Sequence, residues 1–172
     1  RYNGASGWTQ ISGRLKHISV GLNGVVWGVN SSNNIYRYNG NNSWTQISGP
    51  SGGLNHISVG ADGAVWGISP SDELYRYDGG SSWTRIFSNF KYVAVRTGEE
   101  IWAIYYNGSI YRHDGTNFTA YVAPPSNNLV QLDVGMGGEV WGVAADDRIY
   151  RYDDPGWMEI PNGARKKHIA VG

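Results

Sequence analysis

The sequence repeats itself, and this repetition limits the folds open to the chain more than any other feature. A Val-Trp-Gly-Val segment, or a close variant, occurs four times, and each copy is followed by a variant of Ile-Tyr-Arg-Tyr. Its tryptophan lies at positions 27, 66, 102 and 141, so successive copies are 39, 36 and 39 residues apart. Repeats of this length indicate structural units that bury their apolar faces against one another. We place the repeats at residues 17–47, 56–86, 91–122 and 131–160.

Each repeat contains four short strand-like segments. In the first repeat these segments are separated by turns rich in Gly and Asn, and they span residues 17–21, 25–29, 35–39 and 44–47. Four sequential strands joined by tight turns are typical of a four-stranded antiparallel meander. No window has the 3.6-residue apolar period of a helix. Spacing inside the repeat is nearly constant, and only the connector after the fourth strand varies in length, so the fourth strand marks the end of one unit.

The predicted fold is all-β, a β-propeller of four-stranded antiparallel blades. A thin sheet must stack on its neighbours, and a radial stack closes into a propeller, whereas a linear stack needs polar caps that the sequence lacks. Residues 1–11 match the end of a third strand and a fourth strand, and residues 168–172 match a first strand. We therefore expect one domain over residues 1–172, with a closing blade split between the termini. The ring would have five blades as the chain stands, or six if the chain is a fragment.

Composition argues against several classes of function. Fourteen Lys and Arg residues balance fourteen Asp and Glu residues, so nucleic acid is not expected as a partner. The absence of Cys excludes a disulfide framework and a thiolate metal site. No apolar run is long enough for a membrane-spanning helix, so we expect no membrane insertion. No signal peptide precedes Arg1, and the sequence leaves both a cytoplasmic and a secreted location open.

The repeat resembles a known family. Its elements read W-x-x-I, H-I-S-V-G, G-x-V-W-G-V and I-Y-R-Y-x-G, and they are similar to the tectonin repeats of slime-mould and fungal tectonins and fish-egg lectins. The resemblance implies a propeller, usually of six blades, that binds glycans at several equivalent sites. The ligands it implies are bacterial lipopolysaccharide, N-acetylglucosamine-type sugars and O-methylated sugars, and the role it implies is innate defence or agglutination. The third repeat departs from the pattern at Arg96, Ala103 and Phe118.

The Trp and Arg of each repeat are candidate ligand-binding residues. Pairing of the second and third strands sets Trp27 opposite Arg37 on one face of the sheet, and pairing of the first and second strands sets Ile18 opposite Trp27. An indole with a guanidinium beside it suits a sugar, because the ring stacks on apolar C–H groups and Arg donates to hydroxyls. The repetition fits equally well a structural role, in which Trp fills the gaps between blades and Arg links them. The candidates are Trp27, Arg37, Trp66, Arg76, Trp102, Arg112, Trp141 and Arg151.

The histidines do not suggest catalysis. His17, His56 and His168 occupy the same position in different repeats, so we expect them to be dispersed around the ring. A catalytic or metal site instead needs different groups converging on one point. His17 and His56 remain candidates for a structural or ligand-contacting role. The acidic pairs at residues 99–100 and 146–147 are interpreted as solvated turn residues, and we expect no catalytic residue, metal or cofactor.

The favoured hypothesis is a multivalent carbohydrate-binding lectin without enzymatic activity, whose partners are glycans on microbial or cell surfaces. Several weak sites on one rigid ring would give avidity for a repetitive surface. The alternative is a propeller scaffold for protein–protein interaction, although similar repeats favour repeated ligands over one partner. An enzyme acting on glycans would need a carboxylate pair in the central channel, and Asp133 and Glu159 show no feature that recommends them. An oligomer is compatible with the sequence.

Overall fold

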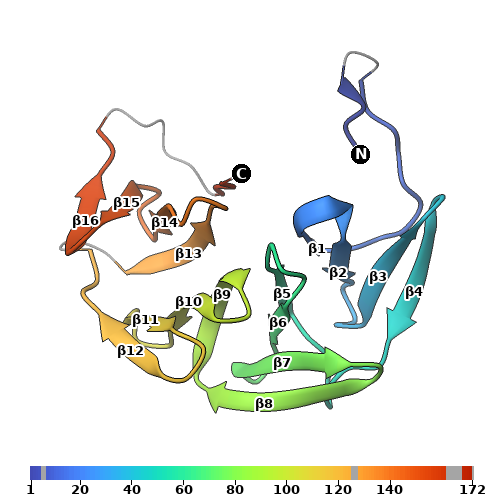
Figure 1. Cartoon of the computed structure of the whole chain (residues 1–172), viewed down its shortest axis with the longest axis horizontal. Coiled ribbons are helices and arrows are strands. Elements are labelled where there is room, and N and C mark those ends of the chain that lie inside the picture. Colours follow the sequence, from blue (N-terminus) through green and yellow to red (C-terminus); the bar gives the residue numbers. More distant parts are fainter. Residues whose placement is uncertain (5–6, 125–127, 162–167, 172) are drawn as a thin grey trace.

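The computed structural model describes residues 1–4, 7–124, 128–161 and 168–171, and these residues form sixteen strands and no α-helix (Figure 1). A 3-10 turn at Leu22–Gly24 follows the first strand. The strands are β1 (His17–Val20), β2 (Val26–Val29), β3 (Ile35–Gly40), β4 (Ser43–Ile47), β5 (His56–Val59), β6 (Val65–Ile68), β7 (Glu73–Gly79), β8 (Ser82–Ser88), β9 (Phe90–Thr97), β10 (Glu100–Tyr105), β11 (Ile110–His113), β12 (Phe118–Tyr121), β13 (Leu129–Val134), β14 (Val140–Ala144), β15 (Ile149–Asp153) and β16 (Gly156–Glu159).

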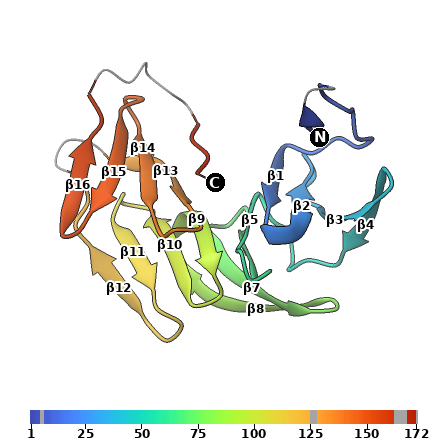
Figure 2. The ribbon, with the colours of Figure 1, turned by 45° about the horizontal axis from the view of Figure 1, so that its top comes forward.

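The strands form four sheets, each built from four sequential antiparallel strands. We call them blade 1 (β1–β4), blade 2 (β5–β8), blade 3 (β9–β12) and blade 4 (β13–β16). The first strand of each blade lies innermost, and β1, β5, β9 and β13 follow one another around a central channel. Figure 2 shows the opening between blade 4 and blade 1. The predicted meander and the predicted β-propeller of four-stranded blades are confirmed.

The first hairpin of each blade differs from the prediction by one residue. Ser19, and not Ile18, lies opposite Trp27, and Ile18 lies opposite Gly28. The reason is the 3-10 turn, which Gly21 closes by donating its N–H to the carbonyl of Val25. This turn is one residue longer than expected. A shift of one residue moves a side chain to the other face of a sheet, so Ile18 and Trp27 face opposite sides of blade 1.

The tryptophan of each second strand forms the core between two blades. Trp27 of blade 1 clusters with Ile57 and Val59 from the inner strand of blade 2, and Trp66 and Trp102 occupy the equivalent places at the next two junctions. All three side chains are 1–3% exposed. Burial of an aromatic side chain of this size contributes a large share of the hydrophobic stabilisation. Each junction therefore has one buried tryptophan within its core cluster.

The glycine that follows this tryptophan is required by close packing. A Cβ atom at Gly67 would lie 2.4 Å from a methyl carbon of Leu54 and 2.8 Å from the carbonyl oxygen of His56. In blade 3 the leucine position is taken by Phe90, and the glycine position by Ala103; both are buried in one cluster. The departure of the third repeat at Ala103 is thus accompanied by a change in its packing partner.

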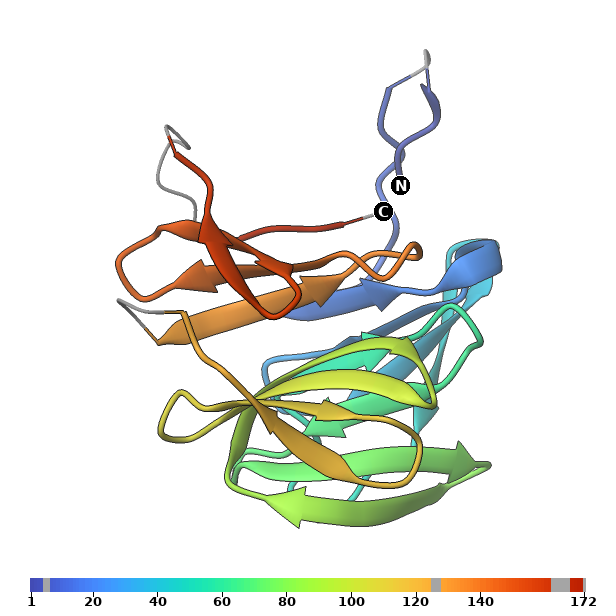
Figure 3. The same ribbon diagram turned by 60° about the vertical axis from the view of Figure 1, so that its left-hand side comes forward.

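The chain ends lie on the two sides of the opening (Figure 1), and both lie toward the top of the view in Figure 3. Val171 donates its N–H to Asp133 of β13 at 2.6 Å, as Val59 of β5 donates to Ser19 of β1 at 3.0 Å. Residues 168–171 therefore lie beside blade 4 in the place of a following inner strand. At the other side, the Trp44 indole of blade 1 donates to the carbonyl of Ser12. The complete closing blade, and the number of blades in the ring, stay predictions.

Candidate functional site

Each blade presents one row of side chains to the blade that follows it. In blade 1, Trp27 lies opposite Arg37, and Arg37 lies opposite Thr45 on the outer strand. Asn39 shares this face because alternate residues of a strand point to the same side. The predicted pairing of Trp with Arg is confirmed in all four blades. The row runs outward from a buried Trp to an Arg at the rim.

The buried tryptophans have no ring face available to a ligand. The centroid of the Trp27 ring lies 5.0 Å from that of Tyr77 in the next blade, and the Trp102 ring lies 5.2 Å from Tyr152. The ring centroids of Trp66 and His113 lie 5.7 Å apart. Trp141 differs, because no further blade follows it among the described residues, and it is only partly buried. At the three junctions the observed geometry is that of the structural role, in which Trp fills the gap between blades.

The arginines lie at the rim of the junctions. The side chains of Arg76 and Arg151 are 50% and 40% exposed, and Arg37 is exposed as well. Burial lowers the pKa of His113 in the next blade, Asp114 opposes this shift, and the charge of Arg76 lowers the pKa further. At each of the three junctions, an arginine at the rim of one blade is therefore accompanied by aromatic side chains of the next blade, and we call this strip of surface the groove of that junction.

The aromatic residue on each fourth strand connects neighbouring blades. The indole N–H of Trp83 donates to the carbonyl of Ser48, which follows blade 1, at 2.8 Å. Trp157 donates in the same way to Val122, after blade 3. The side chain of Phe118 has no N–H, so blade 3 lacks this hydrogen bond to blade 2. The nearly constant spacing of 16 or 17 residues from the second-strand Trp to this aromatic residue is the signal in the sequence, but the partner of the aromatic side chain is a backbone carbonyl that spacing does not reveal.

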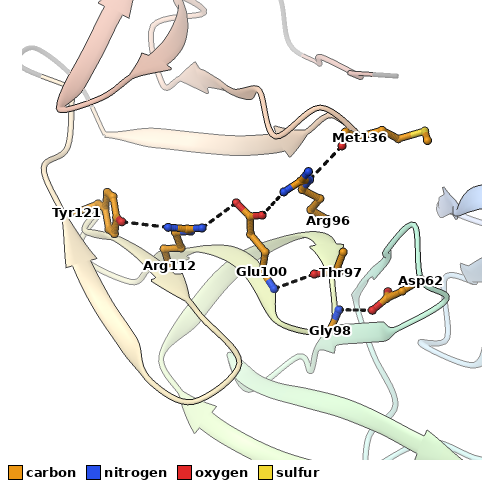
Figure 4. A network of polar contacts seen from close by, with 8 residues as sticks. All are labelled: Asp62, Arg96, Thr97, Gly98, Glu100, Arg112, Tyr121 and Met136. Carbon is orange, nitrogen blue, oxygen red and sulfur yellow. Dashed lines mark hydrogen bonds and ion pairs between the residues drawn. The ribbon is translucent and has the colours of Figure 1, made fainter.

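The third repeat builds a charged network around Glu100 (Figure 4). Glu100 forms two ion pairs: one carboxylate oxygen lies 2.6 Å from a guanidinium nitrogen of Arg96, and the other lies 3.2 Å from a guanidinium nitrogen of Arg112. Arg96 also donates to the carbonyl of Met136, in blade 4, at 3.1 Å. The side chain of Glu100 is only 16% exposed, so the interpretation of Glu100 as a solvated turn residue is wrong. Arg96, which stands where the other repeats have glycine, thus links blades 3 and 4.

The histidines converge at one end of the central channel. The ring centroids of His17 and His56 are 4.3 Å apart, and Tyr92 lies 4.2 Å from His56 on its other side. The expected dispersal around the ring is therefore wrong, because inner strands lie close enough for equivalent side chains to touch. Burial lowers the pKa of His56 to about 3, and His17 adds to this effect. The channel, of about 500 Å³, is lined by the inner strands.

The carboxylates considered for catalysis do not converge. Asp133 lines the channel, where burial raises its pKa and the N–H groups of Val134 and Val171 oppose the shift. Glu159 lies on the outermost strand of blade 4 and pairs with Arg148 at 3.4 Å. Within the described part of the chain, no three His, Cys, Asp or Glu side chains are grouped to hold a metal ion. The same described residues contain no helix long and apolar enough to cross a membrane.

The repeated geometry can be compared with known proteins. The family model of the tectonin domain matches residues 1–124. The chain belongs to the tectonin family. A 30-residue segment is 57% identical to Tectonin-1 of Physarum polycephalum and covers 17% of this chain and 14% of that protein. The fourth repeat lies beyond the matched range, yet its blade has the same strand order as the others.

Solved structures similar to this tectonin chain show the same fold in other families. Virginiamycin B lyase from Staphylococcus aureus aligns with a TM-score of 0.67 at 17% identity, over 90% of this chain and 59% of the lyase. A gluconolactonase from Xanthomonas campestris aligns with a TM-score of 0.64 at 15% identity, over 84% of this chain and 61% of the enzyme. The chain spans about three fifths of each neighbour, and these likenesses concern the fold alone.

Proposed function

We propose that this tectonin chain is a multivalent lectin that binds glycans in the grooves between its blades. The observation that carries the proposal is an arrangement repeated at each junction, in which an exposed arginine lies on one blade and aromatic rings lie on the next. A guanidinium donates several hydrogen bonds in a fixed plane, which suits the hydroxyl groups of a sugar. Aromatic side chains at the rim, such as Tyr77 and Trp83, offer apolar surface for the C–H groups. The proposed role is recognition of microbial or cell-surface glycans in defence or agglutination.

The proposal assigns different roles to the residues of each row. Arg37, Arg76, Arg112 and Arg151 contact the sugar, whereas the buried tryptophans set the spacing of the blades. Trp141 faces the opening and remains a candidate for direct contact. His17 and His56 are proposed as structural, since they pack on each other and on Tyr92. Shallow grooves on one rigid scaffold bind weakly one at a time and strongly together on a surface that repeats the same sugar.

A glycan array followed by calorimetric titration of each hit tests this function. The array includes N-acetylglucosamine oligomers, O-methylated sugars and lipopolysaccharide. We expect more than one binding site per chain, and we expect Arg76→Ala to remove one site while the others keep their affinity. Lys91→Ala is the matched control, because it removes an exposed positive charge outside the grooves. A blank array from folded protein would contradict the lectin function and favour a protein partner. The absence of enzymatic activity stays a prediction.

A further inference from the structure

The four arginines at the rim differ in what neutralises them. In blade 2, the Arg76 Nε lies 3.0 Å from a carboxylate oxygen of Asp78, two residues along the same face. Thr84 donates to the other oxygen of Asp78 at 2.5 Å. This hydrogen bond and the arginine together hold the pKa of Asp78 below its usual value, although desolvation opposes them. The carboxylate is ionised at neutral pH, so Arg76 carries its counter-ion within the protein.

The arginines of blades 3 and 4 are also paired with carboxylates. Arg112 lies 3.2 Å from Glu100 and donates to the hydroxyl of Tyr121 at 3.4 Å (Figure 4). Arg151 lies 3.5 Å from Asp153, the residue equivalent to Asp78. In each of these blades, an anion that approached the guanidinium would meet a carboxylate already in place. A like charge next to a binding site is an effective way to reject one class of ligand.

Blade 1 is different because Asn39 occupies the position of Asp78. The Asn39 amide donates to Thr45 at 2.9 Å, so the side chain keeps the place and the threonine contact of the aspartate but carries no charge. Arg37 is exposed, and among the described residues no carboxylate lies within ion-pair distance of its guanidinium. Glu73 shares its strand face with Tyr77, which contacts blade 1, and Glu73 is itself neutralised by Arg85 at 2.7 Å.

From these contacts we infer that the groove between blades 1 and 2 recognises an anionic sugar through Arg37. The grooves between blades 2 and 3 and between blades 3 and 4 accept neutral sugars only. The inference rests on the proposed lectin function and names the ligand class of each groove. A free guanidinium forms two parallel charge-assisted hydrogen bonds with a sulfate, phosphate or carboxylate group. Asn39 in place of Asp78 is the residue that determines this specificity.

A reciprocal exchange tests the inference. The variants are Asn39→Asp and Asp78→Asn, and both are expected to fold because each residue already contacts a threonine in its own blade. The probes are N-acetylglucosamine and N-acetylglucosamine 6-sulfate, which differ by one anionic group. Binding is followed by NMR titration. The indole N–H signal of Trp83 reports on the groove between blades 1 and 2, and that of Trp157 reports on the groove between blades 3 and 4.

We expect the sulfated sugar to shift the Trp83 signal of the wild-type protein and to leave the Trp157 signal unchanged. Asn39→Asp should weaken binding of the sulfated sugar about tenfold or more and remove its salt dependence, since one charge-assisted interaction is lost. Asp78→Asn should add a second site, at blades 2 and 3. If the sulfated sugar does not bind, or if Asn39→Asp leaves its binding unchanged, the inference is wrong. A positive glycan array with that result would leave the lectin function standing.

Discussion

At the residue scale, one position at the end of the channel carries different side chains that make the same kind of hydrogen bond. The ring of His56 contacts the carbonyl of Val93 in the next inner strand at 2.8 Å through Nε2. In blade 4 the equivalent residue is Gln131, whose amide donates to the carbonyl of Ile169 at 2.9 Å. A carbonyl only accepts, so Nε2 of His56 carries the hydrogen. Both side chains therefore link neighbouring inner strands, and only the histidine can take up a proton.

This difference predicts an acid-sensitive link between blades 2 and 3. Burial lowers the pKa of His56 to about 3 in the folded chain, against 6.5 when exposed. Between these two pH values His56 is protonated in the unfolded chain but not in the folded chain. The contribution of neutral His56 to the free energy of unfolding is therefore fully present above about pH 6.5 and is lost progressively as the pH drops toward 3. From pH 7 to pH 5 the loss due to His56 should be about 2 kcal/mol. Urea unfolding of wild type and His56→Gln checks this: the glutamine variant should lose less stability, and equal losses would contradict the prediction.

At the element scale, the packing of glycine on leucine predicts which repeats tolerate a methyl group. Gly67→Ala would place a Cβ 2.4 Å from Leu54 and 2.8 Å from a backbone carbonyl oxygen, and a backbone atom cannot move aside cheaply. The free energy of unfolding should fall by about 1–3 kcal/mol. The reverse change in blade 3, Ala103→Gly, is the control and should cost no more than about 1 kcal/mol. Urea titration of both variants gives the comparison, and a cost for Gly67→Ala no greater than for the control would refute it.

The elements also show where sequence reasoning succeeds and where it stops. Alternation and constant spacing were sufficient for the meander and for the pairing of Trp27 with Arg37, because both follow from the two-residue period of a strand. Spacing could not show that the 3-10 turn adds one residue, so Ile18 was placed on the wrong face. Nor could it show that the tryptophans are buried, because a repeated core residue and a repeated ligand contact look the same in one sequence. The role of Glu100 depends on Arg96 and Arg112, which only the fold brings together.

At the scale of the whole molecule, the opening exposes the two faces that are buried elsewhere. Ile18 and Val20 of blade 1 are 57% and 60% exposed, while their counterparts in blade 2, Ile57 and Val59, are 0% and 5% exposed. On the other side of the opening, Trp141 is only partly buried. The face after blade 4 and the face before blade 1 thus carry residues equivalent in position to those that meet at every internal junction. Equivalent residues in this chain should therefore contribute unequally to stability.

The last prediction compares Trp66→Ala with Trp141→Ala. Trp66 is enclosed between blades 2 and 3, so its truncation leaves a cavity and should cost about 3–5 kcal/mol. Trp141 has no following blade among the described residues, so its truncation should cost clearly less. Stability in a stacked array is a sum of unit and junction terms, and urea unfolding of the two variants compares a complete junction with an open one. Equal costs would contradict the open face and would mean that Trp141 is covered in solution, by the predicted closing blade or by a further repeat.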